Sequence, residues 1–127
     1  MIIFELENFI LPSNNTYYRK FRNIMTLSEK GKAFKKQYVE FIKALKYEQI
    51  KGKVGIELEI YFKDKRKRDL DNYFKALFDN LKNTVIEDDE NIYEIKAKKI
   101  IGYGKNLIKI KIYSLEEKWK YHNKELT

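Results

Sequence analysis

Hydrophobic and polar residues alternate along several stretches of the chain, and a period of two residues is typical of β-strands. The first alternation begins at Ile2 and runs towards Leu11, where the turn-forming segment Pro12-Ser13-Asn14-Asn15 ends it. The most regular alternation covers residues 54–62, in which every second residue is a large hydrophobic one. Both stretches predict strands that bury one face.

Two more alternating stretches lie close together near the end of the chain. Residues 92–101 are predicted to form one strand and residues 107–113 another, with Gly102-Tyr103-Gly104-Lys105-Asn106 between them. A short glycine-containing segment between two strands is typical of a β-hairpin. We therefore expect these two strands to pair with each other.

Two other stretches repeat hydrophobic residues at the spacing of an α-helix. The first begins at Ser28, which suits the N-cap position, and continues to about Lys46. In the second, the apolar face consists of Leu70, Phe74, Leu77, Phe78 and Leu81. A different face of this second helix carries Asp71, Lys75 and Asp79, which follow one another at intervals of four residues.

The order of these elements predicts an α+β fold with a single domain. We expect two helices packed on one mixed β-sheet, in the order β-α-β-α-β-β, with the domain covering residues 1–113. Residues 114–127 then form a C-terminal tail. Ser114-Leu115-Glu116-Glu117 has the spacing of a capping box, which predicts a short helix around Trp119.

Composition narrows the chemistry. The chain has 127 residues, the size of one domain, and carries 27 Lys and Arg residues against 19 acidic ones. The net charge of +8 favours a polyanionic partner such as nucleic acid, with an anionic membrane surface or simple solubility as the alternatives. Without cysteine it has no disulfide and no thiolate metal site, and its one histidine, His122, makes imidazole catalysis improbable. No apolar run is long enough for a membrane span and no secretion signal is recognisable, so we expect a cytoplasmic protein with no membrane partner.

Asp69 and Asp71 are candidate metal ligands because they stand at the predicted entrance of the second helix. Inside one helix, two residues that are two positions apart point in very different directions, whereas their carboxylates converge if Asp69 ends the extended segment and Asp71 begins the helix. The positive end of the helix dipole would also favour an ionised Asp71. The alternative is an ordinary helix cap, with Lys75 as an ion-pair partner one turn later.

An acidic segment, Glu87-Asp88-Asp89-Glu90, follows in this basic chain. Its charges repel one another and would repel a phosphate backbone unless a divalent cation lies among them. Oxygen ligands without His or Cys suit Mg²⁺, with Mn²⁺ as the other option, and such an ion lowers the pKa of bound water. Lys75 could polarise that water or offset charge on the scissile phosphate. The alternative for the acidic segment is a solvated turn before a strand.

Two basic stretches are candidates for contact with nucleic acid. Lys65-Arg66-Lys67-Arg68 leads directly into Asp69, and Tyr17-Tyr18-Arg19-Lys20 combines aromatic rings that stack on bases with cations that bind phosphate. The alternatives are a solvated surface run for the first and, for the second, a turn whose tyrosines cover the edge of the core.

In combination and in order, these motifs resemble the RusA family of Holliday junction resolvases. The residues that carry the resemblance are Leu11-Pro12-Ser13-Asn14-Asn15 with Tyr17-Tyr18-Arg19, Ser28-Glu29-Lys30-Gly31, Arg68-Asp69-Leu70-Asp71-Asn72 with Lys75, Phe78-Asp79 and Leu81, and Val85-Ile86-Glu87-Asp88-Asp89 with Ile92. Together they span most of the chain before the last strands.

The resemblance implies a homodimeric, metal-dependent endonuclease that cuts four-way DNA junctions by paired nicks, because two symmetric cuts call for two sites related by a two-fold axis. It assigns the catalytic carboxylates to Asp69, Asp71 and Asp89 and the catalytic lysine to Lys75. The segment before the acidic pair is short and lacks a glycine, which leaves Asp88 as the alternative to Asp89. The resemblance also makes Asn14 and Asn15 candidate DNA contacts, beside Tyr17 and Arg19. Two further functions stay open: a non-catalytic basic nucleic-acid-binding module, and a nuclease of the same chemistry acting on other branched DNA or on RNA.

Overall fold

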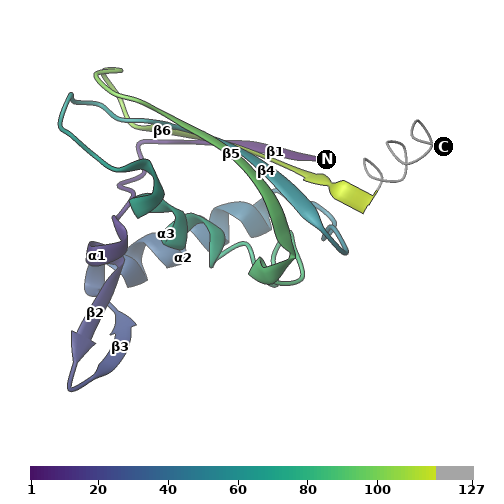
Figure 1. Cartoon of the computed structure of the whole chain (residues 1–127), viewed down its shortest axis with the longest axis horizontal. Helices are drawn as coiled ribbons and strands as arrows, with labels where there is room; N and C mark the ends of the chain where they lie inside the picture. Colours follow the sequence, from purple (N-terminus) through teal and green to yellow (C-terminus); the bar gives the residue numbers. More distant parts are fainter. Residues whose placement is uncertain (117–127) are drawn as a thin grey trace.

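The computed structural model describes residues 1–116, and its body is a four-stranded sheet (Figure 1). The strands are β1 (Ile2–Glu7), β4 (Val54–Tyr61), β5 (Ile92–Ile100) and β6 (Leu107–Ser114), in the spatial order β1-β6-β4-β5. β6 pairs antiparallel with both β1 and β4, and β4 pairs parallel with β5. The predicted α+β class with one mixed sheet is therefore confirmed.

The predicted hairpin between the last two strands is wrong, because β4 lies between β5 and β6. The connecting segment crosses the end of β4 instead of turning back beside β5. The backbone N–H groups of Gly102, Tyr103 and Gly104 donate to the carbonyl oxygens of Asp64, Phe62 and Lys63, respectively. Alternation along a strand shows which face is buried but not which strand lies next to it.

Two helices cover one face of the sheet, as predicted (Figure 1). α2 (Glu29–Ala44) begins at Ser28, whose hydroxyl oxygen accepts the Gly31 N–H at 2.9 Å, so the predicted cap is confirmed. Phe34, Tyr38 and Ile42 on α2 are buried in the core, at the i, i+4 and i+8 positions of one helix face.

The second helical segment is shorter than its hydrophobic pattern predicts. It consists of a 3₁₀ turn, η1 (Leu70–Tyr73), followed by α3 (Phe74–Phe78). The Asn80 side-chain amide donates to the Ala76 carbonyl at 2.7 Å, the oxygen that a longer helix would pair with the Asn80 backbone N–H. Asn80 therefore helps to end α3 while Leu77, Phe78 and Leu81 still pack in the core.

An insertion between β1 and α2 was not predicted. It consists of α1 (Asn14–Tyr17) and a hairpin of β2 (Tyr18–Phe21) and β3 (Ile24–Leu27), which projects from the body of the molecule (Figure 1). Its two turn residues, Arg22 and Asn23, have φ of 50° and 65°. Both values are in the left-handed region, where hairpin turns usually place Asn-Gly or Asp-Gly, so the sequence carries no common hairpin signal.

The opposite face of the sheet carries charged side chains in cross-strand pairs. Lys109 lies 3.8 Å from Glu5 and Lys111 lies 3.9 Å from Glu57, measured between side-chain nitrogen and oxygen. No helix within residues 1–116 is long and apolar enough to cross a membrane. The predicted helix around Trp119 lies outside the described residues.

Candidate active site

Asp69 and Asp71 lie where the segment after β4 enters η1. Asp69 has extended backbone angles (φ −87°, ψ 124°) and Asp71 lies in the first turn, as required for their carboxylates to point towards a common region. Asp69 makes no side-chain cap hydrogen bond to η1, and in the described part of the chain Asp71 and Lys75 form no ion pair. Among the described residues, the structure therefore shows neither a cap hydrogen bond to the Asp69 side chain nor an ion pair between Asp71 and Lys75, and both aspartates are exposed.

The basic segment before Asp69 is organised by Asp64. Its carboxylate accepts the Arg66 backbone N–H and forms a 2.7 Å ion pair with Arg68. Arg66 binds the same carboxylate through two side-chain nitrogens. Hydrogen bonds from these two arginines hold the pKa of Asp64 well below its usual range, and the same ion pair raises the pKa of Arg68.

Arg68 has a structural role in addition to its charge. Its side chain is 15% exposed and its guanidinium lies 4.3 Å from the centre of the Phe62 ring. Its carbonyl oxygen accepts a hydrogen bond from the Lys99 ammonium on β5. These contacts hold the residue next to Asp69 against the sheet, whereas Lys65 and Lys67 in the same segment are exposed to a polyanion.

Asp89, the third predicted ligand, lies in a second acidic group. Asp88 caps a 3₁₀ turn, η2 (Asp89–Asn91), by accepting the Glu90 N–H at 3.2 Å, and it also pairs with Lys82 at 3.5 Å. The side chains of Asp88 and Asp89 hydrogen-bond to each other, which lowers the pKa of Asp88 and raises that of Asp89. Asp89 is thus the member of the pair that holds a proton more readily.

Asp79 and Tyr18 belong to the same neighbourhood, although the sequence did not indicate that they contact each other. The Tyr18 hydroxyl donates to Asp79 at 2.6 Å, across 61 positions of the chain. Burial and the negative charges of Asp79 and Asp89 raise the pKa of Tyr18, and the charge of Asp79 also contributes to the raised pKa of Asp89. The sequence signal for Asp79 was its spacing of four residues from Lys75.

The structure brings the predicted residues together only in part. Within residues 1–116, no group of three or more His, Cys, Asp or Glu side chains is close enough to hold a metal ion. Asp69 and Asp71 lie at η1 and Asp89 lies at η2, while η1 contacts β5, the strand that directly follows η2.

Lys75 lies beside the predicted DNA contacts of α1. The Asn14 side-chain oxygen accepts the Lys75 backbone N–H at 3.3 Å, so Asn14 joins α1 to the start of α3. Asn15 and Arg19 are exposed. Tyr17 is 2% exposed and its hydroxyl accepts a hydrogen bond from Asn80 at 2.9 Å, which supports the packing alternative for this ring.

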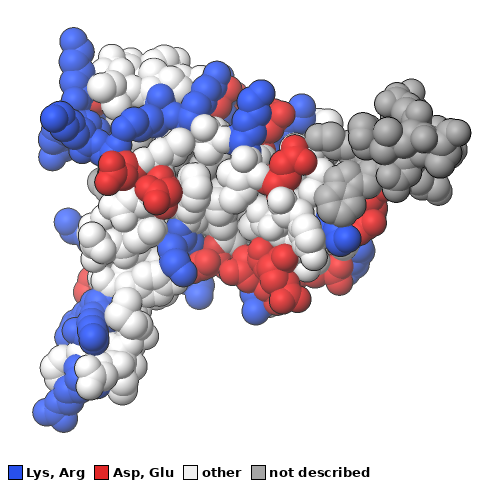
Figure 2. Space-filling model, in the orientation of Figure 1, with Lys and Arg blue, Asp and Glu red and all other residues white. Residues whose placement is uncertain are grey.

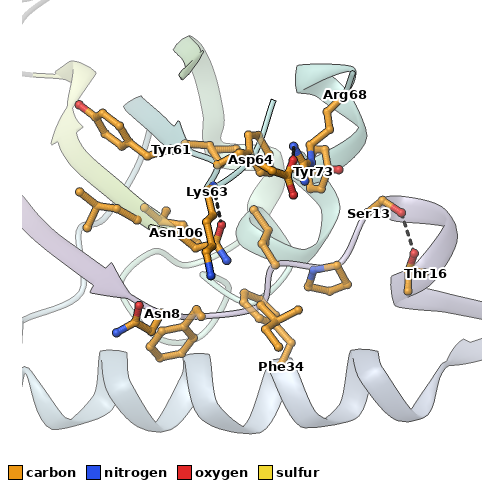
Figure 3. Close-up of a pocket in the computed structure, with 18 of the residues that line it drawn as sticks. Asn8, Ser13, Thr16, Phe34, Tyr61, Lys63, Asp64, Arg68, Tyr73 and Asn106 are labelled. Carbon is orange, nitrogen blue, oxygen red and sulfur yellow. Dashed lines mark hydrogen bonds and ion pairs between the residues drawn. The ribbon is translucent and has the colours of Figure 1, made fainter. Parts of the chain in front are cut away.

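A groove of about 860 Å³ runs beside this region, between the segment that joins β1 to α1, the helix α2 and the end of β4 (Figure 3). Phe34, Phe62 and Tyr73 line it together with the cationic residues Lys30, Lys63, Arg66, Lys67 and Arg68. Asn106 supports the wall by accepting the Lys63 backbone N–H at 2.9 Å. The three aromatic side chains are largely buried and Asp64 also lines the groove, so the exposed part of the wall is mainly cationic and polar.

Charge is distributed unevenly over the surface that contains these residues. In Figure 2, Lys and Arg gather over the segment between β4 and η1 and along the hairpin, whereas Asp and Glu gather around η2. A basic surface of this kind attracts polyanions, and the acidic cluster around η2 interrupts it locally.

Comparison with known proteins agrees with the sequence motifs. The profile of the family described as "Endodeoxyribonuclease RusA" matches residues 9–113. The chain is 34% identical over 107 residues to the crossover junction endodeoxyribonuclease rusA of Enterobacteria phage HK97, covering 83% of this chain and 89% of the relative. It is 41% identical over 71 residues to the enzyme of the same name from Escherichia coli K12, covering 55% of this chain and 59% of the relative.

A third relative, the crossover junction endodeoxyribonuclease rusA of Enterobacteria phage 82, is 39% identical over 71 residues, which cover 55% of this chain and 59% of the relative. The family profile covers most of the chain and includes η1, α3 and η2, the elements that carry the candidate site. The chain belongs to the RusA family of endodeoxyribonucleases.

Proposed function

We propose that this protein is a metal-dependent, structure-selective endonuclease that resolves four-way DNA junctions by paired symmetric nicks. One observation carries the proposal: in a chain with a net charge of +8, the carboxylates of Asp69 and Asp71, two positions apart in the sequence, are exposed, and Lys75 forms no ion pair with Asp71. A free carboxylate pair in a basic surface suits a metal ion that meets phosphate. The relatives' names supply the class of substrate.

The chemistry of the donor set fits a hard divalent cation. Asp69, Asp71 and Asp89 offer carboxylate oxygens, and the described chain has neither cysteine nor histidine with which to form a zinc site. We propose that these three residues hold Mg²⁺, or Mn²⁺, with Asp88 as the alternative to Asp89, although within residues 1–116 the structure does not bring three such side chains close enough together to hold an ion. When bound, the ion would lower the pKa of a coordinated water and polarise the scissile phosphate.

Asp89 has a property that suits this role. It shares a hydrogen bond with Asp88 and lies near the charge of Asp79, so its deprotonated form is disfavoured in the absence of a cation. A divalent cation would favour that deprotonated form, because metal ligation requires the carboxylate. Mg²⁺ affinity should therefore rise with pH through the raised pKa of Asp89.

The remaining residues bind and orient the DNA. Lys75 follows Asp71 by one helical turn and supplies a positive charge to the scissile phosphate. Lys65 and Lys67 are exposed beside Asp69, and Arg66 and Arg68 shape the segment that carries them. Asn14, Asn15 and Arg19 extend the contact surface towards the hairpin, where they would hold the backbone of the DNA in register.

We further propose that the active form is a homodimer, because paired nicks on opposed strands require two active sites related by a two-fold axis. In such a dimer each chain cuts one strand. A single site would have to release the first strand, turn over on the junction and bind the second.

The first experiment is to incubate the purified protein with a labelled synthetic four-way junction and with a linear duplex of matched sequence, in Mg²⁺ and in EDTA. We expect symmetric nicks in the junction alone, and none in EDTA. Binding without nicks in any divalent ion would instead establish the basic binding module. Nicks in flaps, forks or RNA but not in the junction would establish a related nuclease with another substrate.

A further inference from the structure

The hairpin β2–β3 exposes three large hydrophobic side chains around its turn. Phe21, Ile24 and Met25 are 57%, 63% and 60% exposed, and Phe21 and Ile24 face each other across the turn. A monomeric protein rarely presents several large apolar groups together on a projecting element without a partner for them. In Figure 1 the hairpin extends away from the body of the molecule, and these three side chains are not in the hydrophobic core.

The same element is strongly basic. Residues 14–28 contain Arg19, Lys20 and Arg22 and no acidic residue. The guanidinium carbons of Arg19 and Arg22 lie 5.9 and 5.3 Å from the centre of the Phe21 ring, so these two cations and this ring form one surface. Met25 pairs with Lys20 on the other face of the hairpin. Two copies of this surface would repel each other, whereas DNA offers phosphates for the cations and base faces for the apolar groups.

The base of the hairpin is attached to the candidate active site. The hydroxyl group of Tyr18, the first residue of β2, donates a hydrogen bond to Asp79, and the charge of Asp89 contributes to the raised pKa of Tyr18. A strand rises by about 3.3 Å per residue, so four residues place the turn roughly 13 Å from Tyr18. That distance is well within the diameter of a DNA duplex, so the turn can reach bases while the acidic site meets a backbone phosphate.

We propose that the tip of this hairpin, formed by Phe21, Ile24 and Met25, inserts between base pairs at the branch point of a DNA junction, while Arg19, Lys20 and Arg22 bind the flanking phosphates. When an apolar side chain inserts between two base pairs, the complex loses the stacking energy of that base-pair step. At a branch point the continuous stack is already interrupted, so insertion costs less there than in a linear duplex. The tip thus selects branched DNA, and this inference rests on the proposed function.

The test uses a four-way junction and a matched linear duplex, each with 2-aminopurine at the corresponding base, in EDTA so that no strand is cut. The tip variant combines Phe21→Ser, Ile24→Ser and Met25→Ser. Its matched control is Ile3→Ser, on β1, where the side chain is 55% exposed. A second variant combines Arg19→Gln, Lys20→Gln and Arg22→Gln, which removes the charges and keeps the tip.

We expect the wild type to raise 2-aminopurine fluorescence in the junction and not in the duplex. The tip variant should lose this signal and bind the junction roughly tenfold more weakly, because it lacks the apolar side chains that insert at the branch point. A tenfold change in affinity corresponds to about 1.4 kcal/mol, and the change on the duplex should be less than about twofold. The charge variant should bind both DNAs more weakly, and Ile3→Ser should behave as the wild type. The fluorescence signal of the wild type tests the insertion by itself, so the test remains valid even if a variant does not fold.

Three results would overturn the inference. Suppose that the wild type prefers the junction in EDTA and cuts it in Mg²⁺, but the tip variant keeps both the preference and the fluorescence signal. The proposed function then stands and the tip has no part in it. If sedimentation shows that the tip variant is monomeric and the wild type dimeric, the hairpin is a contact between copies. If the wild type neither prefers nor cuts the junction, the proposed function fails, and the inference fails with it.

Discussion

Asp71 carries the most direct prediction at the scale of a single residue. Asp71→Asn keeps the shape of the side chain and removes the charge that a divalent ion needs, so we expect cleavage in Mg²⁺ to fall by more than about a hundredfold. Junction binding should stay within about threefold, because the cationic surface is unchanged. The measurement pairs a cleavage time course with a binding titration in EDTA.

Glu57→Gln is the matched control for this change, because Glu57 is an exposed carboxylate on the opposite face of the sheet, paired with Lys111. It should cut at the rate of the wild type. If Asp71→Asn cuts as fast as this control, Asp71 is not a metal ligand and its charge is only part of the surface.

Asp64 predicts a dependence of stability on pH. Its pKa is lowered in the folded state by Arg68 and Arg66, so its carboxylate contributes stability above its unfolded pKa of about 3.9 and loses that contribution as the pH falls. Asp64→Asn removes the effect. We therefore expect the variant to unfold at lower urea concentration than the wild type at pH 7, and the difference to narrow below about pH 4.

Asp64 is well exposed, with 41% of its side-chain surface accessible, so the difference should be small and should shrink in high salt. Urea midpoints of both proteins at several pH values provide the measurement. A difference that stays constant from pH 7 to pH 3 would show that Asp64 acts through packing or its neutral hydrogen bonds and not through its charge.

At the scale of elements, Gly31 joins α2 to α1. A glycine inside a helix usually costs stability relative to alanine, so Gly31→Ala would ordinarily stabilise the protein. Here an added Cβ would overlap the carbonyl oxygen of Tyr17, which is backbone and cannot rotate away. We expect Gly31→Ala to destabilise the fold by about 1–3 kcal/mol, as overpacking does.

The same change should slow junction cleavage, because Tyr17 precedes the hairpin and Tyr18 contacts Asp79. Lys32→Ala, at the next and exposed position of α2, is the control and should leave both properties nearly unchanged. Urea unfolding and a cleavage time course make the comparison. A more stable Gly31→Ala protein would mean that α1 can move away from α2 without cost.

The elements also show how much of the fold was predictable. The four strands and the first helix followed from local periodicity, since alternation and the Ser28 cap are properties of neighbouring residues. The position of β5 in the sheet could not be predicted in this way. β4 lies between β5 and β6, and no local pattern in the sequence encodes which strands are neighbours. The hairpin β2–β3 was missed because Arg22-Asn23 forms its turn without the usual glycine.

The candidate site was predictable to the same extent. Asp69, Asp71 and the acidic segment stood out because local charge patterns marked them. The contact between Tyr18 and Asp79 joins residues 61 positions apart, so the sequence alone gave no sign of it. For Tyr17 the sequence left two alternatives open, base stacking and packing on the core, and its burial beside Asn80 supports packing.

For the whole molecule, the proposed function requires one small domain both to attract DNA and to hold a cation, and the balance of charge suits both tasks. The net charge of +8 draws the polyanion to the surface from a distance, and the acidic residues at η1 and η2 interrupt that surface locally. Without a divalent ion these acids repel the backbone. Metal and DNA should therefore bind cooperatively, each reducing the electrostatic cost of the other.

The proposed homodimer gives the last prediction. Two symmetric cuts require two active sites, so a dimer of one wild-type chain and one Asp71→Asn chain, isolated with two different tags, should cut one strand of each junction. A supercoiled plasmid with an extruded cruciform reports the difference. Two cuts within one binding event linearise the plasmid, whereas a single cut releases the supercoiling, and the cruciform is reabsorbed before a second cut. We expect linear product from the wild-type dimer and nicked circles from the mixed dimer.

Linear product from the mixed dimer at the wild-type rate would mean that one active site makes both cuts, and the two-fold arrangement would then not be needed for resolution.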